Sequence, residues 1–203
     1  MERQTATGLR PAIETDDADF FTLLELSSPH LATAFGQRTP QILKDMFRLG
    51  GNLFGFDHVE FAESDGRPAG MLLGYDWNEK RRENLRTGLL ILEGMKLDFL
   101  RMLPSLVRSG MAVGIVEPGE FFVSNIAVYG EFRGAGAGRA LMESAEARAR
   151  AAGASKMSLE ADVNNAPAVA MYKKMGFAVQ RDISLTLDGH EQNYHRMVKT
   201  FGA

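Results

Sequence analysis

The chain has 203 residues, of which 45% are hydrophobic and 24% charged, a composition that predicts one ordered globular domain, 1–203. Its formal net charge of -3 excludes the strongly basic surface that favours non-specific nucleic-acid binding. The absence of cysteine excludes a disulfide framework, a thiolate zinc site and a cysteine nucleophile. Because no apolar run reaches the length of a signal peptide or a membrane span, we expect a soluble cytoplasmic protein with neither nucleic acid nor membrane as partner.

The N-terminal part of the chain predicts a strand, two helices and a hairpin. The segment LRPAI (9–13) is typical of a strand and is followed by a helical pattern. Apolar residues at near-helical spacing between 31 and 55 predict a second helix that ends at Gly50-Gly51. Two apolar runs flank Asp65-Gly66, a dipeptide that favours a two-residue hairpin turn.

Residues 78–119 interrupt this pattern and predict an insertion of one or two helices. The segment begins with charged residues, continues as an amphipathic run and contains Pro104. One face is expected to be buried, and its apolar positions are Leu89, Leu92, Leu97, Leu100 and Leu103. Such an insertion would shape an acceptor pocket, mediate dimerisation or cover apolar sheet.

The C-terminal part alternates strands and helices. In chain order we expect a strand, a helix, a strand, a helix and a hairpin, at 121–128, 139–152, 156–163, 166–175 and 177–200. Gly153 and Gly176 are placed to end the two helices, and Asp188-Gly189 to turn the hairpin.

The run RGAGAG (133–138) lies between a predicted strand and a predicted helix. Bare backbone at a helix N-terminus suits a phosphate ligand, because the amides are unpaired and can be approached closely. A P-loop is excluded because its lysine is absent. A dinucleotide fingerprint is also excluded, since Arg139 or Leu141 stands where its third glycine belongs. Taken alone, the run is equally compatible with a tight turn that binds no ligand.

Four segments together resemble the GNAT acetyltransferase superfamily, and they are LRPAIETDDA, NIAVYGEFRGAGAGRALM, LEADVNNAPAVAMYKKMGF and YHRMVKT. The resemblance covers nearly the whole chain, and one departure is Gly130, where members often carry proline. It implies an α/β (α+β) GNAT fold: a mixed, mostly antiparallel sheet of about seven strands flanked by helices, with the helical insertion between strands three and four. Acetyl-CoA would bind where strands four and five splay apart.

The resemblance also implies the residues that bind the cofactor. Backbone groups of 126–128 would pair with the pantetheine arm, the loop amides would grip the pyrophosphate, and Asn165 would hold the arm or simply cap its helix. The implied cofactor-binding residues are Ile126, Ala127, Val128, Arg133, Gly134, Ala135, Gly136, Ala137, Gly138, Arg139, Asn165 and Tyr172.

Two further residues match family positions that act on the reacting groups. Tyr172 matches a tyrosine that donates a hydrogen bond to the sulfur of CoA; its place in an apolar helical stripe is also typical of a core residue, but its position in the motif favours the functional role. Glu160 matches a glutamate of ribosomal-protein-acetyltransferase-like members that serves as general base; a solvated strand glutamate is the alternative. Its ordinary pKa requires it to act through water or with a shifted pKa. Glu120 is the second candidate for the base.

The resulting prediction is an acetyl-CoA-dependent N-acetyltransferase in which the amine attacks the thioester directly, within a ternary complex. The alternative is a non-catalytic acyl-CoA-binding or sensing module. The acceptor would be a small-molecule amine or the N-terminal or lysine amine of a protein, and a homodimer is possible. The histidines show no metal-ligand spacing, so we expect no metal and assign surface or hairpin positions to His30, His58, His190 and His195.

Overall fold

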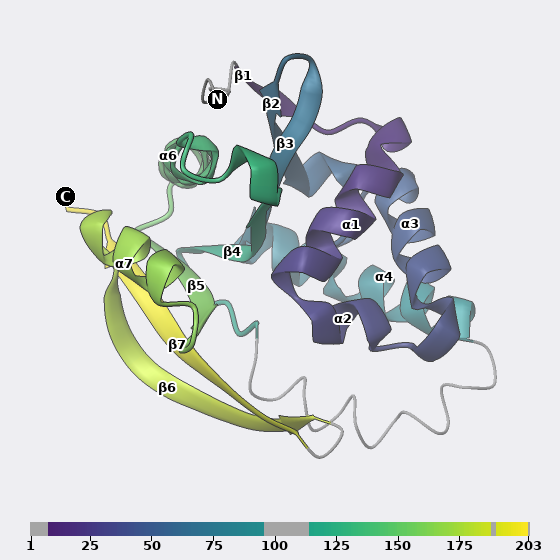
Figure 1. The fold of residues 1–203 in the computed structure, drawn as a ribbon. Coiled ribbons are helices and arrows are strands. Elements are labelled where there is room, and N and C mark those ends of the chain that lie inside the picture. The colour runs from purple at the N-terminus through teal and green to yellow at the C-terminus, as the bar shows by residue number, and fades with distance from the viewer. Residues whose placement is uncertain (1–7, 96–113, 188–189, 203) are drawn as a thin grey trace.

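A seven-stranded sheet with helices on both faces forms the protein (Figure 1). The computed structural model describes residues 8–95, 114–187 and 190–202. Its strands are β1 (Gly8–Pro11), β2 (Val59–Ser64), β3 (Arg67–Asp76), β4 (Glu120–Val128), β5 (Lys156–Asp162), β6 (Ala178–Leu187) and β7 (His190–Thr200). Its α-helices are α1 (Asp17–Ser27), α2 (Pro29–Thr33), α3 (Thr39–Leu49), α4 (Trp77–Met95), α6 (Ala137–Ala151) and α7 (Ala166–Lys174). Within these residues, no helix is both long and apolar enough to cross a membrane.

The sheet is mixed and mostly antiparallel, as the sequence predicts. Its strand order is β1-β2-β3-β4-β5-β7-β6, and the β4–β5 pair is parallel while the others are antiparallel. The β2–β3 turn is the predicted hairpin, because Asp65 and Gly66 both adopt positive φ, 52° and 71°. The predicted turn at Asp188-Gly189 lies outside the described residues.

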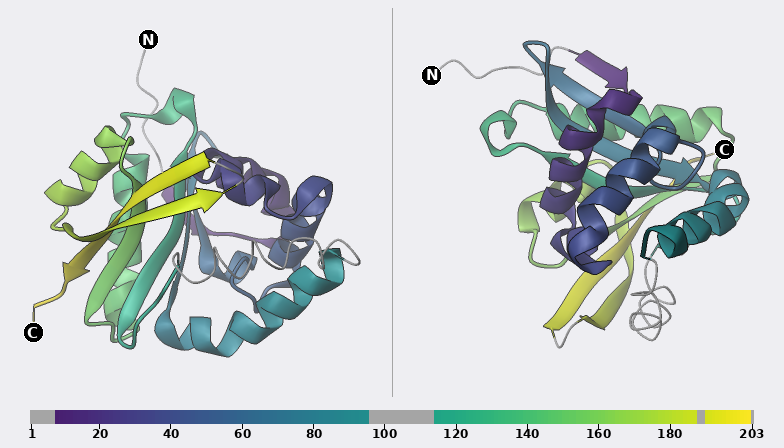
Figure 2. Two further views of the ribbon diagram at one scale, coloured as in Figure 1. Left: turned by 90° about the horizontal axis from the view of Figure 1, so that it is seen from below. Right: turned by 90° about the vertical axis from the view of Figure 1, so that its right-hand side faces the viewer.

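Helices cover both faces of the sheet (Figure 2), and an apolar core lies on each face. On one face, α6 and α7 pack through residues such as Leu141, Ala145 and Val169, which recur at helical spacing. On the other face, α1, α3 and α4 pack around Phe20 and Phe47, whose rings stack with centroids 4.4 Å apart. Alternate residues of the strands point into the two cores.

A β-bulge interrupts β4 at its middle. Leu73 pairs with Asn125 and Gly74 with Val123, so Ser124 is an extra residue without a partner on β3. The extra residue reverses which side chains face which core. Val123 packs in the α6–α7 core, whereas Asn125, two positions on, donates hydrogen bonds to serines at the end of α1.

The first part of the predicted insertion forms helix α4, which lies between β3 and β4 in the chain. Residues 96–113 of the insertion lie outside the described residues. Within the chain, the predicted burial of Leu89 and Leu92 is wrong, since these residues are 56% and 37% exposed; Leu97, Leu100 and Leu103 lie outside the described residues. The helix is turned so that Glu83, Thr87 and Met95 are buried instead. Polar partners stabilise this orientation, since Glu83 accepts a hydrogen bond from a buried histidine and the Thr87 hydroxyl accepts one from a backbone N–H.

Candidate functional site

The two central strands separate on one side of the bulge. Their ladder runs from Glu120–Lys156 to Val123–Leu159 and stops there. Beyond this point no residue of the described ranges pairs with β4 on its β5 side, although its other edge stays paired with β3 through Val128. We call the space between Ser124–Val128 and Glu160–Asp162 the β4–β5 opening. Its unpaired backbone edge is suited to an extended ligand that carries amides, because such a ligand can pair as an extra strand would.

The glycine run follows β4 directly and forms the turn into α6. Gly134 and Gly136 have φ of +80° and +93°, values that L side chains rarely adopt, and a Cβ built on either would meet no atom within 4 Å. Steric crowding therefore does not explain these glycines; the backbone conformation does. Arg133 turns back, and its Nε donates to the carbonyl of Val128 at 3.2 Å.

The predicted cofactor amides lie in the first turn of α6. This helix begins at Ala137, two residues before the predicted start, and its first intrahelical bond runs from the N–H of Ala140 to Gly136 at 2.9 Å. The N–H groups of 137–139 therefore lack intrahelical acceptors, and their partial positive charge suits an anion. Arg139 is exposed and pairs with Glu143 at 2.8 Å, so its own charge is partly compensated.

Asn165 and Tyr172 belong to α7, which follows β5. Asn165 caps this helix, accepting a hydrogen bond from the N–H of Ala168 at 3.3 Å. Tyr172 is 5% exposed and packs beside Phe177, with ring centroids 6.0 Å apart. Burial raises the pKa of Tyr172 to about 12, and no residue in the described ranges hydrogen-bonds its hydroxyl. The structure thus gives both residues a structural role and leaves the tyrosine hydroxyl available to a ligand.

Glu160 is the first residue of β5 beyond the last β4–β5 pair, and it is not a solvated strand glutamate. Its side chain is 6% exposed and lies on the opposite face of β5 from Leu159, which packs in the α6–α7 core. Both carboxylate oxygens accept from the N–H of Gly114, at 3.1 and 3.3 Å, and one accepts from Arg196 at 3.4 Å. Tyr172 and Glu160 therefore belong to opposite faces of the sheet.

Glu120, the second candidate for the base, is bound in a closer ion pair. Its Oε1 lies 2.7 Å from Nη2 of Arg196, and the two side chains are 0% and 2% exposed. Its other oxygen accepts from the N–H of Glu117 at 2.6 Å. With both oxygens occupied inside the protein, Glu120 balances the buried arginine.

Burial raises the pKa of Glu160, and the Gly114 N–H together with the charges of Arg196 and Arg181 opposes that rise. A raised pKa brings a carboxylate closer to the value that an efficient general base needs near neutral pH. Burial also raises the pKa of Tyr75 to about 12 and lowers that of Lys80. The candidate base therefore belongs to a cluster of polar groups withdrawn from water.

Sequence reasoning missed three members of this cluster: Lys80, Gly114 and Arg196. The arginine has a partial signal, since strand alternation puts it on one face between Tyr194 and Val198, but its two glutamate partners lie 36 and 76 residues away along the chain. Lys80 and Gly114 lie in the predicted insertion, where the pattern indicated only helices. No local signal identifies either of them.

A second polar cluster lies at the base of α4, and it corrects the assignment of His58 to a surface or hairpin position. This side chain is 3% exposed, and its Nε2 lies 2.6 Å from Oε2 of Glu83. With Asp57 the two residues offer ligand atoms within 4.8 Å of one another. Glu83 is, however, already shared between His58 and Arg82 at 2.8 Å. These contacts account for the cluster as the junction between α4 and the start of β2.

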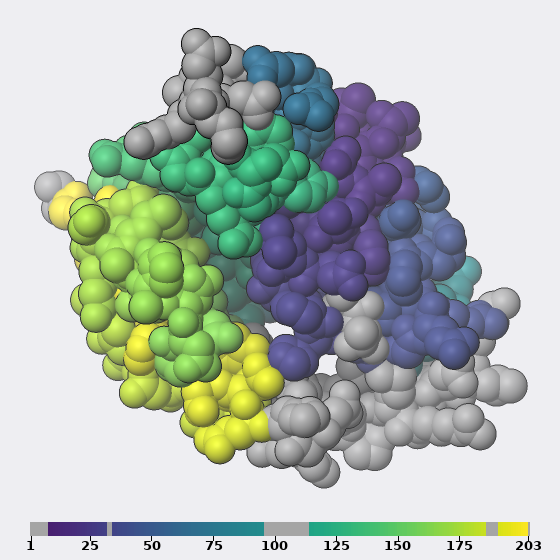
Figure 3. Space-filling view, viewed as in Figure 1, coloured from purple at the N-terminus to yellow at the C-terminus, as the bar shows by residue number. Residues whose placement is uncertain are grey.

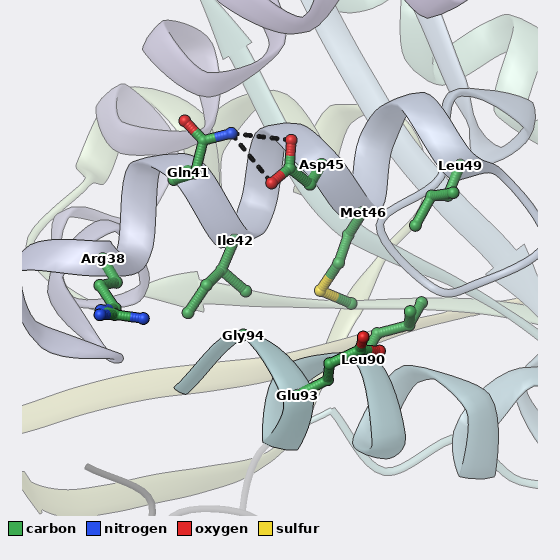
Figure 4. Close-up of a pocket in the computed structure, with 9 residues that line it drawn as sticks. All are labelled: Arg38, Gln41, Ile42, Asp45, Met46, Leu49, Leu90, Glu93 and Gly94. Atoms are coloured by element: carbon green, nitrogen blue, oxygen red, sulfur yellow. Dashed lines mark hydrogen bonds between the residues drawn. The ribbon is translucent and has the colours of Figure 1, made fainter. Parts of the chain in front are cut away.

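Grooves between helices mark the described part of the surface. One, of ≈ 580 Å³, runs between α3 and α4 on the side away from α6 and α7; Ile42, Met46 and Leu90 line it, and Gln41 bonds Asp45 on its rim (Figure 4). The other, of ≈ 410 Å³, lies between α6 and α7 and begins at Arg139, just after the glycine run. The space-filling view shows a separate hollow between α1–α2 and the region of α7 and the β6–β7 hairpin (Figure 3).

Comparisons with known proteins agree with this fold. The model of a family described as the acetyltransferase (GNAT) family matches residues 20–177. An N-acetyltransferase from Staphylococcus aureus Mu50 is similar in structure, with a TM-score of 0.66 and 21% identity over 95% of this chain and 100% of that one. A ribosomal-protein-alanine N-acetyltransferase from Brucella melitensis has a TM-score of 0.58, with 15% identity over 96% and 99%. An acetyltransferase from Bacillus subtilis in complex with CoA has a TM-score of 0.54, with 14% identity over 91% and 93%. No curated protein matches the sequence.

Proposed function

Because the chain belongs to the GNAT acetyltransferase family, we propose that it transfers an acetyl group from acetyl-CoA to a primary amine by direct attack within a ternary complex. One observation carries this proposal: the β4–β5 opening begins where the ladder stops, with Glu160 on one face of the sheet and the α7 helix of Tyr172 on the other. A thioester in the opening can be approached by an amine from the side of Glu160, while its sulfur faces Tyr172.

The cofactor would be held by backbone groups. The pantetheine arm pairs with the free edge of 126–128, and the pyrophosphate binds the amides of 134–139 at the start of α6. Arg133 fixes the turn through Val128, and Asn165 supports α7 as its cap. The groove between α6 and α7 continues from this loop and offers space to the nucleotide end of CoA. No metal takes part in the proposed reaction.

The reaction needs two proton transfers. Glu160 accepts a proton from the ammonium form of the acceptor, directly or through water; the amine nitrogen then bonds to the carbonyl carbon. As the tetrahedral intermediate collapses, the carbon–sulfur bond breaks and the nitrogen gives up its second proton, which passes through water to the departing thiolate. Tyr172 donates a hydrogen bond to this thiolate and keeps its own proton. A phenol whose pKa burial has raised to about 12 holds its proton at neutral pH, so it is suited to donate this bond.

The acceptor is proposed by class only. Glu160 and Asp162 carry negative charge on one face of β5, which favours a cationic amine over an anionic one. The resemblance of Glu160 to a glutamate of ribosomal-protein-acetyltransferase-like members supports a protein N-terminal amine. Small-molecule amines and lysine side chains are the competing acceptors.

The experiment is a panel assay. The purified protein is incubated with acetyl-CoA and, separately, with alanine-initiated peptides, lysine-containing peptides with blocked N-termini, and small amines, and CoA thiol release is followed. The proposal expects amine-dependent thiol release and an acetylated product of matching mass. Tight binding of acetyl-CoA without product from any amine would favour the non-catalytic acyl-CoA-binding module.

A homodimer remains a proposal as well. Leu85, Leu89 and Leu92 form an exposed stripe on α4 that a second copy would bury. Sedimentation velocity of the wild type and of Leu89→Gln tests this, with dissociation of the variant as the expected result and unchanged sedimentation as the contrary one.

A further inference from the structure

A short chain of hydrogen bonds connects α4 to the candidate base. Nζ of Lys80 donates to the carbonyl of Gly114 at 2.6 Å, and the N–H of the same glycine donates to the Glu160 carboxylate at 3.1 and 3.3 Å. One peptide residue is therefore fixed on both sides, by an ammonium on α4 and by a carboxylate on β5.

Lys80 is held at this place rather than extended into water. It is half-buried, and its ammonium lies 5.7 Å from the centroid of the Tyr75 ring. Glycine suits the linking position because its φ is +69°. A lysine normally keeps its ammonium in water, so a half-buried one that bonds a carbonyl and faces an aromatic ring is held by its surroundings.

Arg196 does not replace the hydrogen bond that Gly114 donates to Glu160. It lies 2.7 Å from Glu120 but 3.4 Å from Glu160, so its main ion pair is with Glu120. Among the residues that the structure describes, Gly114 is thus the closest hydrogen-bond donor to the Glu160 carboxylate. In the described part of the chain, the titratable and charged groups around Glu160 are Tyr75 on β3, Lys80 on α4, Glu120 on β4, Asp162 on β5, Arg181 on β6, and Tyr194 and Arg196 on β7.

We propose that Lys80 is a positioning residue which, through Gly114, orients the carboxylate of Glu160 toward the acceptor amine and keeps it ionised. We call the hydrogen-bond chain Lys80–Gly114–Glu160 the link. The role of Glu160 as base rests on the proposed function, whereas the link itself does not. It follows that the insertion contributes to the chemistry as well as to the shape of the acceptor side. The hydrogen bond that the Gly114 N–H donates stabilises the charged form of the Glu160 carboxylate. Loosening Gly114 therefore favours the protonated form and raises the pKa of Glu160.

The test compares three variants. Lys80→Met removes the ammonium and keeps the length of the side chain, and Lys80→Arg restores a cationic donor. Arg81→Met is the matched control, because Arg81 is the next residue of α4 and also lies over an aromatic ring, that of Trp77, but is exposed. Carbon-13 NMR follows titration of the Glu160 carboxylate, which is assigned from its absence in Glu160→Gln, and the pH profile of kcat/KM is measured beside it.

In Lys80→Met we expect the Glu160 pKa to rise by about one unit, because the hydrogen bond that Gly114 donates to the carboxylate is loosened and the nearby positive charge of Lys80 is lost. The acid limb of kcat/KM should move to higher pH by the same amount, activity should recover on the alkaline side, and KM for acetyl-CoA should stay unchanged. Lys80→Arg should lie between Lys80→Met and the wild type. A merely structural role for Lys80 would lower activity at every pH instead.

The link and the proposed function fail in different ways. A Glu160 titration unchanged in Lys80→Met, or shifted equally in Arg81→Met, would overturn the link. A carboxylate pKa that moves while the kinetic profile stays fixed would support the link and reject Glu160 as the base.

Discussion

Replacing Glu120 by glutamine separates the two glutamates that contact Arg196. The Glu120 and Arg196 side chains are 0% and 2% exposed and lie 2.7 Å apart, so the substitution leaves a buried guanidinium without its closest counter-charge. Removing one partner of a buried pair costs about 3–5 kcal/mol in general. Two contacts reduce that figure: Glu160 still lies 3.4 Å from Arg196, and the glutamine carbonyl can still accept the Glu117 N–H. We therefore expect the free energy of unfolding to fall by about 2–3 kcal/mol.

For a chain of this size, that loss corresponds to a drop in Tm of about 4–12 °C. Urea unfolding at pH 7, followed by circular dichroism, measures the free energy, and thiol release measures turnover on the same samples. Glu160→Gln should show the converse pattern. Because burial already raises the pKa of Glu160, removing its charge relieves desolvation, so stability should change by about 1 kcal/mol or less while turnover falls at least tenfold. Equal losses of stability in the two variants, or a larger loss in Glu160→Gln, would refute the assignment of Glu120 to structure and Glu160 to catalysis.

Three further predictions concern the cofactor site and its pH dependence. Tyr172→Phe should reduce turnover while stability changes by less than about 1 kcal/mol, since packing beside Phe177 is kept; unchanged turnover with a lower Tm would make Tyr172 a core residue only. Gly136→Asp should remove the roughly 2.7 kcal/mol of stabilisation that acetyl-CoA gives at a hundred times its Kd. Gly36→Asp, the control at another glycine of positive φ, should keep this stabilisation. Equal stabilisation of both variants by acetyl-CoA would reject the loop as the anion site. The acid limb of the pH profile of kcat/KM should have a midpoint above 4.5, the usual pKa of a glutamate, because burial raises the Glu160 pKa. This limb should disappear in Glu160→Gln, and a limb that persists would belong to another group.

Local signals predict most of the fold. The hairpin at Asp65-Gly66 and the helix ends near Gly50, Gly153 and Gly176 follow from backbone conformations that glycine adopts readily, and these glycines all show positive φ. The strands and helices of the C-terminal half follow from periodicity, which needs only neighbouring residues. The sheet with helices on both faces then follows from the alternation of elements and from the family resemblance.

The orientation of α4 could not be predicted in this way. Periodicity favours burial of Leu89 and Leu92, but the helix buries Glu83 and Thr87 because a histidine and a backbone N–H bind them. A hydrophobic pattern assigns polar residues to solvent, and it fails where partners distant in sequence satisfy them. For the same reason the sequence indicates a surface position for His58.

The candidate site was predicted in its residue types but not in its connections. Resemblance identifies Glu160 and Tyr172, whereas the bulge at Ser124, which sets the side-chain facing of β4 beside the opening, leaves no mark in the sequence. The contacts of Glu160 come from β7 and from Gly114, and they depend on the assembled sheet. Long-range ion pairs of this kind decide which glutamate is free to act.

A crystal structure of the protein with CoA bound tests the central claim most directly, because the account places the reacting atoms in the β4–β5 opening. We expect the pyrophosphate on the amides of 134–139, the pantetheine arm beside 126–128, and the sulfur within about 3.5 Å of the Tyr172 hydroxyl, with the Glu160 carboxylate across the opening from it. CoA bound elsewhere, such as in the groove between α3 and α4, or a sulfur on the side away from Tyr172, would contradict the account.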